Sequence, residues 1–167
     1  LAGTFRLGDV ARVAVETEAR HLLGGSSFVL GAHLRTRMYA FEEADVPDIS
    51  LEAFLDCVEE ALAAEAPPGA LTAPIESGGA AIFLATPSQK AKEAARRRFG
   101  ERLRTRDDIE VDRLTAAGDS DAVMDLALLA TTDALVTSEH STFSYVAQSL
   151  AGVRPFVVTG SRAAVGG

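Results

Sequence analysis

The chain has 167 residues, a net charge of −8 and one cysteine. This length suits one folded domain, and the negative charge argues against duplex nucleic acid as a partner, because neutralising its phosphates needs a basic face. The single cysteine excludes an internal disulfide, and no apolar run approaches the length of a membrane span.

Short apolar runs alternate with helical patterns along the chain, as is typical of βα units on a mainly parallel sheet. The first half predicts a helix over 8–25, a strand over 26–34, a helix capped by Ser50 and a strand over 80–85. The second half predicts a helix capped by Ser88 and ended by Gly100, a strand over 108–114, a helix capped by Ser120, a strand over 133–138, a helix starting near Ser141 and a strand over 154–160. The predicted fold is α/β, one Rossmann-like layer sandwich.

Two of these helices carry expectations about burial. In the helix near Ser141, four side chains share one stripe at helical spacing and are expected to face the core: Phe143, Val146, Ala147 and Leu150. The helix that Ser120 is expected to cap is apolar nearly all round, which predicts that it is buried.

Ligands of such sheets bind beyond the carboxyl ends of the strands, which selects the loops after Leu34, Ala85 and Val136. The first of these loops carries Arg35, whose forked guanidinium suits a phosphate. A surface arginine in a solvated ion pair is the alternative. The neighbouring His33 could equally fill space.

The stretch "SEHSTFSYVAQSL" (138–150) places hydroxyl groups at a helix start, where unpaired N–H groups and the helix dipole favour an anion. Ser141 and Thr142 could add donors there, or Ser141 could simply cap its helix. Further upstream, Asp125 is a carboxylate among apolar neighbours and needs a partner. A guanine edge, an arginine or a backbone amide would each serve. The three histidines lack metal-ligand spacing, so no metal site is predicted.

These stretches together resemble a known family. "DLALLATTDALVTSEHSTFSYVAQSLAGVRPFVV" (125–158) is similar to the C-terminal motif of plant cell-wall, xyloglucan-type fucosyltransferases. "VLGAHLRTR" (29–37) resembles the first motif of the wider α1,2-, α1,6- and protein O-fucosyltransferase superfamily, and "AIFLATPSQKAKEAARRRFG" (81–100) its middle motif.

The resemblance implies a Rossmann-like domain with a mainly parallel sheet, the C-terminal half of a GT-B glycosyltransferase. Residues 1–167 would form one GDP-sugar-binding domain, with the N-terminal acceptor domain outside this chain. The enzyme would transfer fucose from GDP-fucose to a glycan hydroxyl, with inversion and without a metal or other cofactor. The acceptor would be a cell-wall polysaccharide such as xyloglucan, and the location the lumenal side of the Golgi membrane.

The resemblance also assigns roles to residues of this chain. Arg35 would hold the β-phosphate as a catalytic residue, and His33 and Asp125 would contact guanine. Glu43 aligns by spacing with a carboxylate of the α1,6 branch and is the candidate general base. The residues expected to close round the diphosphate and fucose are Ser141, Thr142 and Phe143.

Several positions depart from the family pattern. Thr36 and Met38 stand where the superfamily often has arginine and aspartate, and Ser144 replaces a glycine. Glu139 and His140 replace a small residue and a tryptophan. These departures motivate an alternative function, a non-catalytic GDP-sugar-binding or interaction module on a degenerate transferase scaffold.

Overall fold

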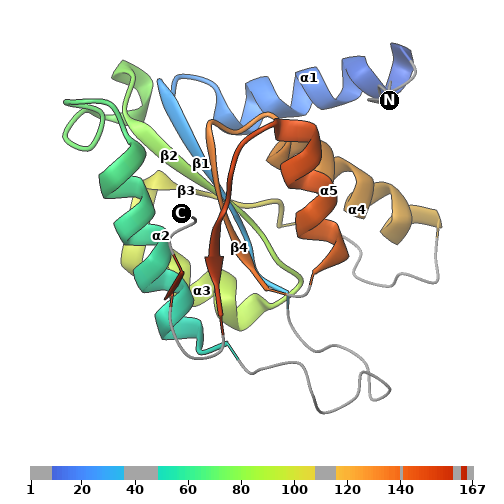
Figure 1. Cartoon of the computed structure of the whole chain (residues 1–167). Coiled ribbons are helices and arrows are strands. Elements are labelled where there is room, and N and C mark those ends of the chain that lie inside the picture. Colours follow the sequence, from blue (N-terminus) through green and yellow to red (C-terminus); the bar gives the residue numbers. More distant parts are fainter. Residues whose placement is uncertain (1–8, 36–48, 108–115, 140, 160–162, 165–167) are drawn as a thin grey trace.

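The computed structural model describes residues 9–35, 49–107, 116–139, 141–159 and 163–164. They form a six-stranded sheet in the order β3-β2-β1-β4-β5-β6, with helices on both faces (Figure 1). The strands are β1 (Phe28–His33), β2 (Ala80–Ala85), β3 (Leu103–Arg104), β4 (Ala134–Ser138), β5 (Phe156–Val158) and β6 (Ala163–Ala164). The helices are α1 (Asp9–Leu23), α2 (Leu51–Glu65), α3 (Gln89–Phe99), α4 (Ala116–Leu129) and α5 (Thr142–Ala151), with two short 3₁₀ turns, η1 (Ile75–Ser77) and η2 (Gly100–Arg102).

All neighbouring strands from β3 to β5 pair in parallel, and β6 runs antiparallel to β5. This confirms the predicted α/β fold with a mainly parallel sheet. The strand expected over 108–114 lies outside the described residues, and the edge position of the sheet is taken by β3 instead.

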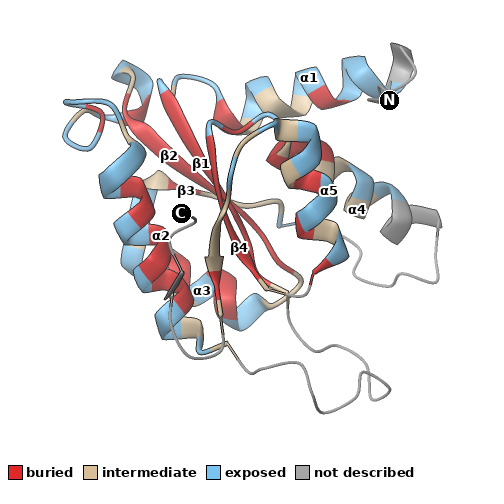
Figure 2. Cartoon of the chain, in the orientation of Figure 1, coloured by how far each residue is buried: buried red, intermediate tan, exposed pale blue. Residues whose placement is uncertain are grey.

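The two faces of the sheet bury separate cores, as the alternation of side chains along each strand requires. On one face, Leu30 and Ile82 pack with the α2 residues Phe54 and Val58, while α3 adds two alanines to the same core. On the other face, sheet residues such as Phe83 pack against α1, α4 and α5. The three central strands β1, β2 and β4 are accordingly buried on both sides (Figure 2). No described helix has the length and apolar content needed to cross a membrane.

Three predicted helix caps are confirmed. The side-chain oxygens of Ser50, Ser88 and Ser141 each accept a backbone N–H three residues further on. These bonds satisfy an N–H group that the first turn of a helix leaves without a partner. Gly100 ends α3 with a φ of 54°, a conformation that costs a residue without a side chain little.

The predicted cap at Ser120 is wrong, because α4 begins at Ala116 and Ser120 lies exposed inside the helix. Alanine has the highest helix propensity, so the two alanines upstream extend the helix by a turn. The expected burial of this helix holds only for part of its surface. Leu128 and Leu129 are fully buried, whereas Val123 is 51% exposed.

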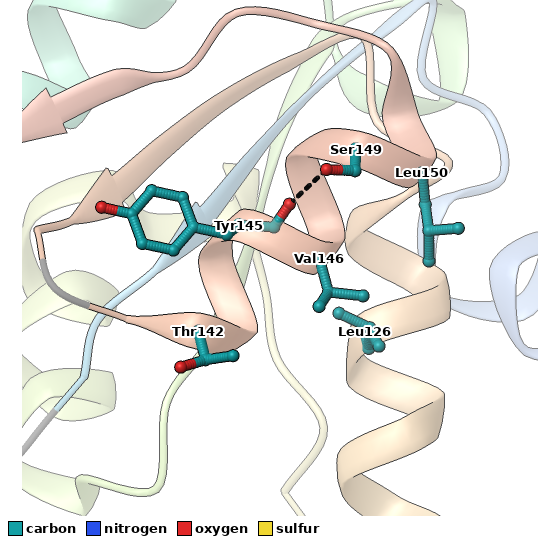
Figure 3. Close-up of a pocket in the computed structure, with 6 residues that line it drawn as sticks. All are labelled: Leu126, Thr142, Tyr145, Val146, Ser149 and Leu150. Carbon is teal, nitrogen blue, oxygen red and sulfur yellow. Dashed lines mark hydrogen bonds between the residues drawn. The ribbon is translucent and has the colours of Figure 1, made fainter. Parts of the chain in front are cut away.

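The predicted core stripe of α5 is confirmed for two of its four members and wrong for the other two. Ala147 is buried and Phe143 packs against the same core partly buried, whereas Val146 and Leu150 are 40% and 38% exposed. These two side chains point toward Leu126 of α4 rather than toward the sheet (Figure 3). Helical periodicity identified the apolar stripe, but Val146 and Leu150 face α4, which leaves them partly exposed to solvent.

Candidate functional site

The sheet order creates a switch point at β1. The chain passes from β1 to β2 on one side and later places β4 on the other side of β1. Ligands of open α/β sheets bind beyond the carboxyl ends of the strands at such a point. His33, the last residue of β1, is in register with Ala85 of β2 and Thr137 of β4. The three loops selected from the sequence therefore begin side by side at one edge.

Arg35 lies at this switch point, one residue past the last backbone bond between β1 and β2. The N–H of Leu34 donates to the carbonyl of Ala85 at 3.2 Å, and the N–H of Arg35 donates to Oγ of Ser138 at 3.0 Å. The backbone leaving β1 is thus held to both neighbouring strands. Arg35 is half-buried, and its side chain extends from a backbone that these hydrogen bonds hold in place.

The end of β1 is bound to the first turn of α5. The His33 side chain is buried, and its Nδ1 shares a 2.7 Å hydrogen bond with Oγ of Ser144. Its ring stacks on Phe143, with centroids 4.7 Å apart and an angle of 28° between the planes. Ser141 is buried beside them, 3% exposed. We call His33, Ser141, Phe143 and Ser144 the histidine corner.

Ser141 can both cap α5 and donate a hydrogen bond to an anion, the two roles considered from the sequence. Its Oγ accepts the N–H of Ser144 at 3.4 Å, and its carbonyl accepts the N–H of Tyr145 at 3.1 Å. A serine hydroxyl that accepts one hydrogen bond still has a proton to donate. The N-terminus of α5 also carries the partial positive charge of the helix dipole. Capping and anion binding at Ser141 are therefore compatible.

Thr142 lies apart from the histidine corner. Its side chain is exposed and lines a groove of about 320 Å³ between α4 and α5 (Figure 3). The other lining residues are Leu126, Tyr145, Val146, Ser149 and Leu150. The groove is mainly apolar and differs in character from the polar histidine corner.

A second polar cluster lies where the chain leaves β3. Arg106 uses each of its guanidinium nitrogens: Nη2 is 2.6 Å from a carboxylate oxygen of Asp121, Nη1 is 3.2 Å from one of Asp125, and Nε is 3.6 Å from one of Glu18. Nζ of Lys92, in the first turn of α3, donates to the carbonyl of Arg106 at 2.5 Å. We call these five residues the arginine corner.

Burial sets the electrostatics of the arginine corner. Asp125 is 8% and Lys92 4% exposed. Desolvation raises the pKa of Asp125, and the positive charge and hydrogen bond of Arg106 act against that rise. Desolvation likewise lowers the pKa of Lys92, against the attraction of Asp107 and Asp125. Of the three partners that the sequence left open for Asp125, the structure contains the arginine.

Sequence reasoning missed several residues of both corners. Arg106 and Lys92 were not singled out, and Ser138 and Ser144 were read only as parts of a motif. The sequence held no signal for Arg106, because the strand was expected over 108–114, after this residue, whereas the structure has β3 at Leu103–Arg104, before it. Glu43 lies outside the described residues, and among those described no group of histidine, cysteine, aspartate and glutamate could hold a metal.

Comparison with known proteins agrees with this architecture. A family model described as xyloglucan fucosyltransferase matches residues 109–165, which include α4, β4, α5 and β5. No curated protein matches the chain by sequence.

Solved fucosyltransferases share the fold at low identity. Fucosyltransferase NodZ from Bradyrhizobium aligns with 97% of this chain and 48% of its own length, at 17% identity and a TM-score of 0.66. NodZ α-1,6-fucosyltransferase soaked with GDP-fucose aligns with 90% of this chain and 45% of its own, at 18% identity and a TM-score of 0.64. A mutant of Arabidopsis thaliana FUT1 in complex with GDP aligns with 92% and 34%, at 19% identity and a TM-score of 0.61.

The chain therefore spans less than half the length of the solved structures it matches. The predicted resemblance to fucosyltransferases is confirmed, and the fold is that of one half of a GT-B fucosyltransferase.

Proposed function

We propose that this domain binds GDP-fucose and supplies the donor half of a fucosyltransferase that acts on a glycan hydroxyl. The observation that carries the proposal is the switch point, where the end of β1 meets the Ser141-capped N-terminus of α5. NodZ soaked with GDP-fucose and FUT1 in complex with GDP have the same fold. Their ligands are those that this site would take.

In this proposal the diphosphate binds at the N-terminus of α5. First-turn N–H groups, the hydroxyl of Ser141 and the guanidinium of Arg35 donate to its oxygens. When the bond between fucose and GDP breaks, negative charge develops on the leaving diphosphate. Donors already in place stabilise that charge more than they stabilise the bound substrate, which lowers the barrier.

Guanine would contact Asp125 and His33. An ionised carboxylate only accepts hydrogen bonds, and the guanine edge with N1–H and the 2-amino group only donates them. Phe143, stacked on His33, would border the sugar and diphosphate. Thr142 is assigned to the same ligand by the family resemblance alone, because its side chain lines the groove between α4 and α5. Glu43 is the proposed general base.

The remaining parts of the proposal concern the whole protein. The family resemblance supports five further proposals. They are transfer with inversion, independence of metal, a xyloglucan-type acceptor, a separate acceptor domain and a location in the Golgi lumen. Incubating full-length protein with GDP-fucose and xyloglucan, with and without a chelator, would test the acceptor and the metal. The anomeric configuration of the product would test inversion.

Calorimetry on the 167-residue chain tests donor binding directly. We expect GDP to bind more tightly than UDP. Arg35→Ala should weaken GDP binding by about 1.5–3 kcal/mol, the usual worth of a hydrogen bond to a charged group. Arg98→Ala is the control, since Arg98 lies in the last turn of α3 and pairs with Asp56 and Glu59. Absence of GDP binding at millimolar concentration by the folded chain would contradict the proposal.

A second candidate function is a non-catalytic GDP-sugar-binding module. Glu139 favours it, because this acidic residue lies two positions before Ser141, the cap of α5, and its N–H donates to the carbonyl of Val158 at 3.2 Å. A carboxylate there would oppose a diphosphate. Full-length protein that binds GDP-fucose but releases no GDP with any acceptor of a glycan panel would favour this candidate.

A further inference from the structure

We propose that Arg106 is a positioning residue for nucleobase recognition: it holds Asp125 ionised and oriented so that the carboxylate accepts from guanine. The inference rests on the proposed function. Arg106 lies outside the segments that resemble the family's three motifs. Its contacts link the end of β3 to α1, α3 and α4.

The arginine corner is built to fix the direction of one guanidinium. Its three nitrogens contact three different carboxylates, and Nη1 also donates to the carbonyl of Asp121 at 3.1 Å. Lys92 holds the backbone of Arg106 from the opposite layer of the fold. Because all three nitrogens of the planar guanidinium are bound, the group cannot rotate, and its contact with Asp125 has a fixed geometry.

That contact uses only one of the two carboxylate oxygens of Asp125. Arg106 approaches Oδ1, at 3.2 Å, and a carboxylate has acceptor positions on both oxygens. Among the described residues none donates a hydrogen bond to Oδ2 of Asp125. Asp125 therefore retains an oriented acceptor, which suits a ligand edge that presents only donors.

The position of the corner fits this role. Arg106 follows the carboxyl end of β3, and Lys92 belongs to the first turn of α3, which follows the carboxyl end of β2. Asp125 is thus held to the same edge of the sheet as His33. Without Arg106 the buried carboxyl would lose the cation that opposes its protonation, and a protonated acid would present a donor to a donor.

Binding of GDP and of IDP, which lacks the 2-amino group, separates positioning from a merely structural role. We expect the folded chain to prefer GDP by roughly tenfold, the worth of one hydrogen bond to a charged group. Asp125→Asn should abolish that preference. Arg106→Gln should reduce it to about two- to threefold, and Arg106→Lys, which keeps the charge, should restore part of it.

Arg98→Gln is the matched control. Arg98 lies in the last turn of α3 and pairs with Asp56 and Glu59, none of which belongs to the arginine corner, so the GDP preference should stay unchanged. A folded Arg106→Gln variant that keeps the full preference while Asp125→Asn loses it would overturn the inference. If Arg106→Gln does not fold, an unchanged preference in Arg106→Lys would overturn it. Failure of the unsubstituted chain to bind GDP would instead contradict the proposed function.

Discussion

The histidine corner and the arginine corner lie at the same edge of the sheet but are held by different forces. In the histidine corner, a 2.7 Å hydrogen bond and a ring stack join His33 to the first turn of α5. In the arginine corner, one guanidinium is shared by three carboxylates. The first depends on ring packing and hydrogen bonds, and the second on attraction between opposite charges that are largely buried.

The difference implies unequal responses to substitution. One hydrogen bond contributes little net stability, whereas removing one partner of a buried ion pair leaves an uncompensated charge. The arginine corner should therefore be the more fragile of the two, although both present side chains to the same candidate site.

Arg106→Leu should cause the largest loss of stability. It leaves Asp121, Asp125 and Glu18 without their shared cation, and removing one partner of a buried pair typically costs several kcal/mol. Because the arginine side chain is 16% exposed, we expect about 3 kcal/mol, measured by urea unfolding. Arg12→Leu, which removes an exposed ion pair on α1, should cost less than about 0.5 kcal/mol. Equal losses in the two variants would contradict the fragility of the arginine corner.

Ser144→Ala tests the histidine corner and should cost about 1–2 kcal/mol, because His33 Nδ1 loses its buried partner. Ser149→Ala is the matched control on the same helix. Ser149 is exposed and donates to the carbonyl of Tyr145, so its loss should stay within about 0.5 kcal/mol. A loss at Ser144 larger than that of Arg106→Leu would reverse the order of the two corners.

Ser141 allows capping and ligand donation to be separated. Ser141→Ala should cost about 1 kcal/mol of stability, whereas Ser141→Gly should cost only a few tenths, because glycine is tolerated at the cap position. Both variants lack the hydroxyl, so both should weaken GDP binding to a similar extent in calorimetry. If Ser141→Gly binds GDP as tightly as the unsubstituted chain, the hydroxyl caps its helix and does not donate to the ligand.

The same contrast explains what the sequence could predict. The caps at Ser50, Ser88 and Ser141 join atoms three residues apart, so local pattern was sufficient. The strands followed from apolar runs. The contact between His33 and Ser144 spans 111 positions, and its partner became visible only when β1 and α5 met. Burial of Asp125 predicted that it needs a partner, but only the path of the chain beyond β3 identified Arg106.

The failures have a related cause. Helical periodicity identifies an apolar stripe without identifying its neighbour, so Val146 and Leu150 were expected in the core although they face α4 at its open side. At Ser120 a favourable cap residue competed with alanines that propagate the helix further upstream. In both cases the local sequence pattern was present, but neighbouring residues or elements determined the structure that formed.

Cys57 can report whether damage to either corner stays local. It is buried on α2, on the opposite face of the sheet from α4 and α5. Burial and the nearby charge of Glu60 raise its pKa from 9.0 to about 11. At pH 8 the folded chain then holds about a hundredfold less thiolate than a free thiol would, so alkylation should proceed through the unfolded state.

The expected labelling rates follow from the stability losses. Each kcal/mol of global destabilisation should speed alkylation of Cys57 about fivefold, so Ser144→Ala should have a small effect and Arg106→Leu a large one. Labelling that stays slow in Arg106→Leu would show that the arginine corner opens locally. The raised pKa also predicts that thiol-linked stability is fully present below pH 9 and is lost as the pH rises toward 11, an effect that Cys57→Ala should remove.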